Sequence, residues 1–329
     1  MNSLNETVVK PVHSFADKLI ERIRAKQSIT CVGIDPQIQF DSEKSPVPMY
    51  LLDECGGNAN EAIYRFFKDI IEAVADLVPI FKPQIAFFEQ FDAMQALKDL
   101  LTLIREKGAL SIIDAKRNDI GNTSEAYAAS IFKNIGADAT TVNGYLGTDC
   151  IAPFLAYEGK GLFILVKTSN QSSSEFQDLF SMALESVSPD VGEIDAPEGK
   201  LVRNYIQMAT LTRKWGDACV GEAGYSDIGA VVGATFPVQM KLVRDVLPNA
   251  FFLIPGYGAQ GGTAADIVHG VNADGLGAIV NSSRGIDYAY QKDPEKFSPG
   301  QFAAAAHAAV EEMNADIAAA LQESGKMAW

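Results

Sequence analysis

The segment IIDAKRNDIGNT, residues 112–123, places a carboxylate, an ammonium and a second carboxylate close together at Asp114, Lys116 and Asp119. Asp114 and Lys116 end an apolar run, and side chains two residues apart share one face of a strand. Because opposite charges within about 4–6 Å stabilise each other, we expect Lys116 to act as an ammonium that donates a proton. A Schiff-base lysine must be neutral, so an aldolase is disfavoured. The alternative is a solvated turn with surface salt bridges.

A second pattern, IPGYGAQGG, is typical of a loop that offers backbone N–H groups to a phosphate at a helix N-terminus. It holds three glycines and a neutral donor, Gly256, Gly258, Gly261 and Gln260. A dinucleotide-binding loop has the same glycine spacing, but this one lies late in the chain and its acidic partner is uncertain. Arg284 follows in NSSRGI, and its planar guanidinium suits phosphate oxygens. Together the two segments predict a phosphate site, with a tight turn that binds no ligand as the alternative.

Both patterns follow short apolar runs, and the chain has eight such runs. They span residues 29–34, 78–82, 110–114, 139–143, 162–167, 228–234, 251–255 and 277–282. Continuous apolar runs are typical of strands covered on both faces of a parallel sheet. The helical patterns between them span residues 62–75, 86–107, 124–134 and 237–246. Eight such βα units in roughly 250 residues predict an α/β fold, the (β/α)8 barrel with a closed parallel sheet. An open doubly wound sheet is the alternative.

We interpret residues 1–329 as one barrel domain with three additions. Residues 1–28 carry an N-terminal helix that is expected to close the bottom of the barrel. Residues 170–216 form a long insertion after the fifth strand, and loops of this length are usually functional or hold structure of their own. The insertion is predicted to be a lid region or a dimer element. Residues 299–329 are predicted to hold a C-terminal helix.

The composition restricts the class of ligand. With 27 basic and 42 acidic residues the formal net charge is −15, which disfavours partners such as nucleic acid and anionic lipid. An anionic ligand must therefore be held by a local cluster of lysine and arginine. No apolar run approaches the roughly 18 residues of a membrane helix, and the first residues do not match a secretory signal, so we expect a cytoplasmic protein. The scattered cysteines and histidines disfavour a disulfide framework and a zinc site.

In a (β/α)8 barrel the catalytic groups lie where the strands end. The polar residues at the predicted strand ends are Asp35, Lys82, Asp114, Lys116, Asn143, Lys167, Thr168 and Arg284. We expect them to converge at one mouth of the barrel. Asp35 could accept from ribose hydroxyls or cap the following turn. The hydroxyl and amide groups after Thr168 could read the edge of a pyrimidine or form an ordinary polar loop.

The segments VGIDP, FKP, DAKRNDIGNT, KTSN, PGYGAQGG and NSSRGI together resemble the orotidine 5′-phosphate decarboxylase family. The similarity runs from about residue 15 to 300 and is greater to the longer bacterial and protozoal branch. The resemblance implies a homodimeric (β/α)8 barrel that converts orotidine 5′-phosphate to UMP and CO2, the last step of pyrimidine nucleotide synthesis. It implies that no metal, flavin or pyridoxal cofactor takes part.

The resemblance also implies a role for each matching residue. Lys116 would protonate C6 of the pyrimidine, Asp114 would face the departing carboxylate, and Lys82 would bridge to Asp114 and the ribose. Asp119 would reach in from the partner subunit, with Thr123 beside it on the ribose. The other implied substrate contacts are Ile120 in the same segment, Asp35 on a ribose hydroxyl, Thr168 on the pyrimidine edge, and Gly256, Gly258, Gln260, Gly261 and Arg284 at the phosphate. The contact of Gln84 is not assigned.

Two rival functions stay open. One is a Mg²⁺-dependent lyase of the same superfamily that acts on a keto-sugar phosphate, with Asp35 and Asp114 sharing the ion. The other is a non-catalytic nucleotide-binding protein, which would need the phosphate loop but not the array of Lys82, Asp114, Lys116 and Asp119. Activity in the presence of a chelator would separate the first rival from the decarboxylase.

Overall fold

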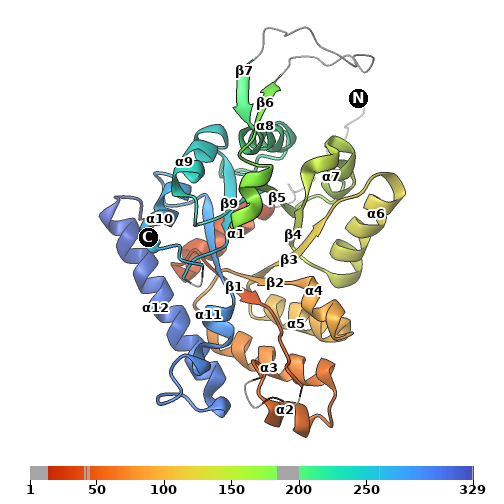
Figure 1. The fold of residues 1–329 in the computed structure, drawn as a ribbon, viewed down its shortest axis with the longest axis vertical. Helices are drawn as coiled ribbons and strands as arrows, with labels where there is room; N and C mark the ends of the chain where they lie inside the picture. The colour runs from red at the N-terminus through yellow and green to blue at the C-terminus, as the bar shows by residue number, and fades with distance from the viewer. Residues whose placement is uncertain (1–13, 41, 43–44, 184–199, 259, 328) are drawn as a thin grey trace, which may run out of the picture.

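The computed structural model describes residues 14–40, 42, 45–183, 200–258, 260–327 and 329. Eight parallel strands close into a barrel in the order β1-β10-β9-β8-β5-β4-β3-β2. Helices surround the barrel (Figure 1). Because β1 pairs with both β2 and β10, the sheet has no free edge. The predicted (β/α)8 barrel is confirmed, and the open doubly wound alternative is wrong.

All eight predicted apolar runs form barrel strands. These are β1 (Thr30–Ile34), β2 (Ile80–Pro83), β3 (Leu110–Arg117), β4 (Ala139–Val142), β5 (Gly161–Lys167), β8 (Ser226–Val232), β9 (Ala250–Ile254) and β10 (Ala278–Ser282). Every residue of β1, β2, β4, β9 and β10 is buried, because each strand is covered by the barrel interior on one face and by helices on the other. This double burial explains why the strands do not alternate apolar with polar residues.

The helices fill the spaces between these strands. They are α1 (Phe15–Lys26), α2 (Met49–Glu54), α3 (Ala59–Val74), α4 (Ile85–Gln90), α5 (Met94–Glu106), α6 (Gly121–Ala129), α7 (Thr148–Leu155), α8 (Asn204–Gly216), α9 (Pro237–Val246), α10 (Ala264–Ile267), α11 (Arg284–Asp287) and α12 (Phe302–Glu323). The single helix predicted over 86–107 is wrong. The chain forms α4 and α5 instead, because Asp92 adopts a left-handed φ of 50° between them. None of the described helices is long and apolar enough to cross a membrane.

Helix α1 covers the bottom of the barrel, as the sequence predicts. The Phe15 ring meets Phe163 edge-on with centroids 6.0 Å apart. A Cβ atom on Gly161, the first residue of β5, would lie only 2.4 Å from the Phe15 ring. The Ala16 N–H donates to Asp227 near the start of β8 at 2.8 Å. Both strand contacts are at amino ends, so the opposite mouth of the barrel stays open for a ligand.

The insertion after β5 contains a 3₁₀ turn, η3 (Gln171–Glu175), and an antiparallel hairpin of β6 (Phe180–Ala183) and β7 (Lys200–Arg203). The hairpin extends outward beside α8 (Figure 1). Residues 184–199 of the insertion and residues 1–13 of the N-terminal extension lie outside the described residues. The lid or dimer role of the insertion over 170–216 stays a prediction. In its described part, the η3 turn begins shortly after the end of β5.

Candidate active site

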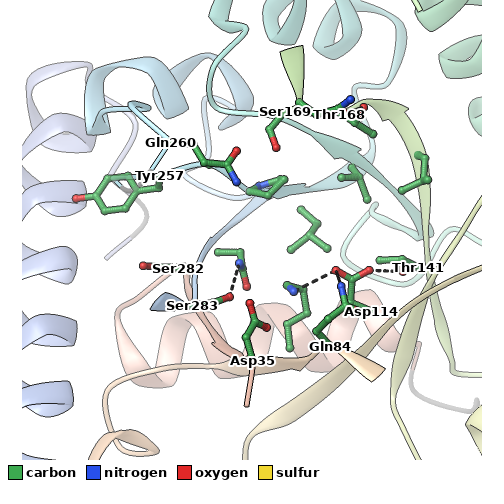
Figure 2. A pocket seen from close by; sticks show the side chains of 18 of the residues that line it. Asp35, Gln84, Asp114, Thr141, Thr168, Ser169, Tyr257, Gln260, Ser282 and Ser283 are labelled. Atoms are coloured by element: carbon green, nitrogen blue, oxygen red, sulfur yellow. Dashed lines mark hydrogen bonds and ion pairs between the residues drawn. The ribbon is translucent and has the colours of Figure 1, made fainter. Parts of the chain in front are cut away.

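A cavity of about 540 Å³ opens at the carboxyl ends of the barrel strands. Its size suits a small-molecule ligand, and (β/α)8 enzymes carry their active sites at this mouth. Asp35, Gln84 and Asp114 lie on one side of it, and Thr168 and Ser169 on the other (Figure 2). The lining residues that the sequence predicted are Asp35, Lys82, Asp114, Lys116, Thr168, Gly256, Gln260 and Arg284.

Asp114 is the centre of the charged array. Its Oδ2 accepts from Lys82 Nζ at 3.2 Å and from Gln84 Nε2 at 3.1 Å. Its Oδ1 accepts from Lys116 Nζ at 2.6 Å and from Thr141 Oγ1 at 2.8 Å. A carboxylate has about four lone-pair sites, and four donors occupy them. The carboxylate is therefore held in one orientation between two ammonium groups.

These neighbours determine the charge states of Asp114 and Lys82. Burial opposes the charged form of Asp114, but Lys82 and Lys116 outweigh it and hold the pKa of this carboxyl well below its usual range. Burial also opposes the charged form of Lys82, but Asp114 and Asp35 outweigh it and raise the pKa of the ammonium above its ordinary value. Both groups are therefore charged at neutral pH, although their side chains are only 11% and 6% exposed.

Lys116 lies in an irregular part of β3. The register between β3 and β4 shifts around it, and its φ of 47° is in the left-handed region that side-chain-bearing residues rarely adopt. Thr141 Oγ1 on β4 accepts the Lys116 N–H at 3.0 Å and so holds this backbone. The prediction that Asp114 and Lys116 meet at the mouth is confirmed, but the meeting depends on a bulge and not on regular strand geometry. Strained backbone of this kind is concentrated at functional sites.

Asp35, which follows β1, brings a second carboxylate into the cavity. Burial raises its pKa, while Lys82 and a hydrogen bond from Ser283 act in the opposite direction. Asp35 Oδ1 and Asn281 Oδ1 are buried acceptors that receive no hydrogen bond from the described residues. Buried acceptors without donors are rare, and ligand hydroxyl groups would satisfy them. The carboxylate lines the cavity, which favours the predicted ribose contact over a turn cap.

The predicted phosphate end is formed by Gly256, Gln260 and Arg284, which all line the cavity. Gly256 adopts φ 96°, where a residue with a side chain would be strained. A Cβ on Gly262 would lie 2.9 Å from the Gly256 carbonyl oxygen, so the loop can close tightly only with glycine there. Arg284, the first residue of α11, supplies a cation to this end of the cavity, since the glycine loop after β9 carries none.

The other parts of the predicted phosphate site stay predictions. The helix after the loop, α10, has four residues, and the N–H groups of Thr263 and Asp266 are engaged in a capping box, which leaves few N–H groups at this helix N-terminus for a ligand. Gly258 and Gly261 are not among the residues that line the cavity, and both adopt positive φ values that shape the turn.

Two predicted strand-end residues also turn away from the cavity. Asn143 Oδ1 accepts the Tyr145 N–H at 3.1 Å and caps a 3₁₀ turn. Lys167 is wholly buried and pairs with Asp178 Oδ2 at 3.1 Å. The charge of Lys167 at a strand end predicts a place in the site, but in the structure it pairs with the insertion instead.

Asp119, Ile120 and Thr123 lie outside this cavity. They stand on the segment between β3 and α6 and in the first turn of α6, where Ile120 and Thr123 are exposed. Asp119 Oδ1 accepts the Ile120 N–H at 2.9 Å. Their contribution to the cavity of a partner subunit stays a prediction.

Ser169 and Asn170 line the cavity and belong to the hydroxyl and amide groups after Thr168 that the sequence offered for a pyrimidine edge. Sequence reasoning gave no role to other uncharged lining residues, namely Thr141, Gln177, Tyr257, Asn281, Ser282 and Ser283. Gln84, whose contact was unassigned, donates to Asp114. The available signals were weak: Thr141 is a hydroxyl inside an apolar run, and Asn281 and Ser283 directly precede Arg284. Gln177 comes from the insertion, and only the folded loop brings it back to the mouth.

The comparisons with known proteins decide the family. The model of the orotidine 5′-phosphate decarboxylase / HUMPS family matches residues 30–296. The chain belongs to this family. The orotidine 5′-phosphate decarboxylase of Caldicellulosiruptor bescii is 37% identical over 303 residues, which cover 84% of this chain and 90% of that protein.

Solved structures agree with this membership of the orotidine 5′-phosphate decarboxylase / HUMPS family. A chain from Toxoplasma gondii superposes with a TM-score of 0.73 at 32% identity, covering 94% of this chain and 99% of the other. The Leishmania donovani OMP decarboxylase gives a TM-score of 0.69 at 31% identity, covering 93% and 98%. This near-complete coverage of bacterial and protozoal proteins confirms the predicted branch.

The family name covers HUMPS members as well as decarboxylases. The metal-dependent alternative is therefore tested against the residues of this site. Asp35 and Asp114 would have to share the ion. All four acceptor sites of Asp114 are taken by protein donors, two of them ammonium groups. A cation could bind there only by displacing one of these donors, and it would then lie next to the ammonium groups of Lys82 and Lys116. The arrangement therefore favours a metal-free site.

Proposed function

We propose that this chain decarboxylates orotidine 5′-phosphate to UMP and CO2 in the cavity at the carboxyl ends of its strands. The observation that carries the proposal is the contiguous array of Lys82, Asp114 and Lys116, with both ammonium groups on one carboxylate. A simple nucleotide-binding protein does not need this arrangement, and the two ammonium groups on Asp114 oppose the binding of a metal ion there. The family and the names of its relatives support the substrate.

Lys116 is the proton donor in this proposal. The bond between C6 and the carboxylate carbon breaks, CO2 leaves, and the electron pair stays on C6. Lys116 Nζ then gives its proton to C6, the new C–H bond forms, and the amine regains a proton from water. A cation held beside the developing charge stabilises the transition state more than the ground state. The Lys116 side chain is 46% exposed, which leaves it accessible to a ligand in the cavity.

Asp114 and Lys82 position this donor. Asp114 is fixed as an anion next to the place where the substrate carboxylate must lie, and the repulsion between them decreases as CO2 leaves. Lys82, buried beneath Asp114 and close to Asp35, links the reacting end of the cavity to the predicted ribose contact. The protein groups are fixed before substrate binds, so little reorganisation accompanies the reaction.

The rest of the cavity binds the nucleotide. Asp35 accepts from a ribose hydroxyl, Thr168 meets the pyrimidine edge, and Gln260 and Arg284 hold the phosphate. The unsatisfied Oδ1 of Asp35 and the position of Arg284 on the lining support these assignments. Binding energy from the phosphate can favour closure of the polar loop that starts at Thr168.

We also propose that two copies of the chain form a homodimer with shared active sites. Asp119, Ile120 and Thr123 would enter the cavity of the partner and complete it beside Lys116. The exposed positions of Ile120 and Thr123 after β3 support this arrangement. The proposal places the dimer in the cytoplasm as a single-domain enzyme that binds neither nucleic acid nor membrane, in keeping with the net charge of −15.

The test is the ultraviolet absorbance of orotidine 5′-phosphate mixed with purified, chelator-treated protein. We expect conversion to UMP at a rate that neither EDTA nor added Mg²⁺ changes. Activity that appears only with Mg²⁺ would support the sugar-phosphate lyase instead. Binding of UMP without any change in the absorbance of the substrate would support the non-catalytic protein.

A further inference from the structure

Gln177 reaches back across the loop that follows β5 and holds Thr168 by two hydrogen bonds. The Thr168 N–H donates to Gln177 Oε1 at 3.0 Å. Gln177 Nε2 donates to Thr168 Oγ1 at 2.8 Å. Both residues line the cavity. The insertion thus contributes a side chain to the mouth of the barrel, and this side chain controls a hydroxyl group that faces the ligand.

The two bonds fix the polarity of that hydroxyl group. A backbone N–H can only donate, so the oxygen of the Gln177 amide must face it, and the NH2 group must face Thr168 Oγ1. The hydroxyl therefore accepts from Gln177 and directs its own hydrogen to Asn170 Oδ1 at 2.7 Å. Its remaining lone pair can serve a ligand only as an acceptor. Without Gln177 the hydroxyl would keep only its bond to Asn170, and it could rotate away from this one partner to offer its hydrogen to the cavity.

Gln177 is itself held in place by an ion pair whose ammonium group is wholly buried. Lys167, one residue before Thr168, pairs with Asp178, one residue after Gln177, at 3.1 Å. Lys167 also donates to Ser173 Oγ at 2.9 Å, and the Gln177 N–H donates to the Ser173 carbonyl oxygen at 2.8 Å. Because buried charges are stable only when paired, this pair fixes the two ends of the loop against each other.

We propose that Gln177 is a positioning residue that sets the Thr168 hydroxyl as an acceptor for the imide N–H of an orotate or uracil ring. A cytosine ring presents an unprotonated nitrogen at that position and would face an acceptor with no hydrogen between them. The site would therefore disfavour cytosine nucleotides. This inference rests on the proposed function, in which Thr168 meets the pyrimidine edge.

The chemistry of the ring agrees with the layout of the cavity. In an orotate ring the imide nitrogen N3 is directly opposite C6, the carbon that loses CO2. Thr168 lies across the cavity from Asp114 and Gln84 (Figure 2). A ring whose C6 lies at the charged array therefore points its imide edge toward Thr168. Recognition of the base and the reaction then use opposite sides of one cavity.

The experiment is isothermal calorimetry with UMP, CMP and ribose 5-phosphate on the full chain and three variants. In Gln177→Leu we expect the ratio of UMP to CMP affinity to fall by about tenfold, the effect of one hydrogen bond, with ribose 5-phosphate affinity unchanged. In Gln177→Glu a carboxylate oxygen captures the hydroxyl hydrogen, so the ratio should be retained. Gln171→Leu, a substitution of an exposed residue on the same loop, is the matched control.

An unchanged ratio in Gln177→Leu would overturn the inference, as would a parallel loss of ribose 5-phosphate affinity, which indicates a structural role alone. Should the leucine variant not fold, a tenfold fall of the ratio in Gln177→Glu would contradict the inference by itself. Decarboxylation is measured separately on the unmodified protein. A protein that shows the expected ratios but no turnover would refute the proposed function and leave the inference standing.

Discussion

The Lys116 ammonium lies 2.6 Å from the Asp114 carboxylate, although only one residue separates them on the same strand. The left-handed backbone at Lys116 and the bulge in β3 bring the two groups together. The proposed proton donor is thus placed by local backbone strain and by an ion pair that exist before substrate binds. Fixed charges of this kind need little reorganisation during the reaction.

The first prediction concerns Lys116. We expect Lys116→Ala to lower kcat by at least about 10⁴-fold, because both a proton donor and a cation beside the carbanion are lost. The affinity for UMP should change by less than about tenfold, since the phosphate and ribose contacts lie elsewhere. Single-turnover kinetics and calorimetry measure the two effects. Lys98→Ala, on the exposed face of α5, is the control, and a UMP affinity that falls as far as the rate would contradict the role.

The second prediction concerns the stability of the Lys82–Asp114 pair. Asp114→Asn leaves the nearly buried Lys82 ammonium without its main partner, which should lower the free energy of unfolding by about 3 kcal/mol. Lys82→Met combined with Asp114→Leu should recover most of this loss while the protein stays inactive. Urea denaturation at pH 7 measures both. The pKa of Asp114 is lower in the folded chain, so its contribution is present above the unfolded pKa and is lost as the pH falls below it.

The matched control for this pair is on the surface. Lys241 and Asp245 form an i, i+4 ion pair with side chains 63% and 62% exposed. Lys241→Ala should change the free energy of unfolding by less than about 0.5 kcal/mol. If Asp114→Asn cost no more than Lys241→Ala, the buried pair would not have the stabilising geometry described here.

The third prediction tests the shared active site. Asp119→Ala and Lys116→Ala should each be inactive as homodimers. When the two are mixed under conditions that exchange subunits, one of the two cavities in a heterodimer contains both intact residues. Activity should then return, approaching a quarter of the unmodified level as subunits exchange at random in an equal mixture. Each variant mixed with itself is the control, and a mixture that stays inactive after exchange is proven would show that Asp119 does not act across the interface.

Much of the barrel could be predicted because strands covered on both faces form continuous apolar runs in the sequence. Each of the eight apolar runs became a barrel strand, and the charged and glycine motifs lay at their carboxyl ends. Where a predicted helix was wrong, no glycine or proline nearby indicated the break. Asp92, for example, ends α4 with a positive φ, yet neither glycine nor proline marks the break that it makes between α4 and α5.

The candidate site could be predicted for charged residues and not for neutral ones. Asp114 and Lys116 are conspicuous in an apolar context, whereas Thr141 looks like any β-branched strand residue. Lys167 was misplaced because its partner, Asp178, lies 11 residues later in the insertion, and pairing at that distance depends on the folded loop. The same loop brings Gln177 to Thr168, which no spacing rule for strand ends could indicate.

The last prediction concerns Asp287, a wholly buried carboxyl group beneath the cavity. Its Oδ2 accepts the Asp35 N–H at 3.3 Å. The titratable groups that influence it are Asp35 and Lys82, and Tyr288 adjoins it. Burial, followed by the repulsion of Asp35, raises the pKa of Asp287 well above its usual value. Folding therefore takes up a proton at any pH between the unfolded and the folded pKa, and stability falls as the pH rises through that window.

Asp287→Asn should remove this pH dependence. The amide oxygen can still accept the Asp35 N–H, but the side chain cannot ionise. We expect the variant to be more stable than the unmodified protein by about 1–2 kcal/mol at pH 8, with the difference shrinking as the pH falls toward about 4, where the unfolded carboxyl protonates. Urea denaturation across this range measures it, with the exposed Glu295→Gln as control. A difference that stays constant with pH would contradict the raised pKa of Asp287, because the folded and unfolded carboxyl groups would then bind the same number of protons throughout this range. A loss of stability at every pH would mean that its Oδ1 has a structural role that the amide cannot fill.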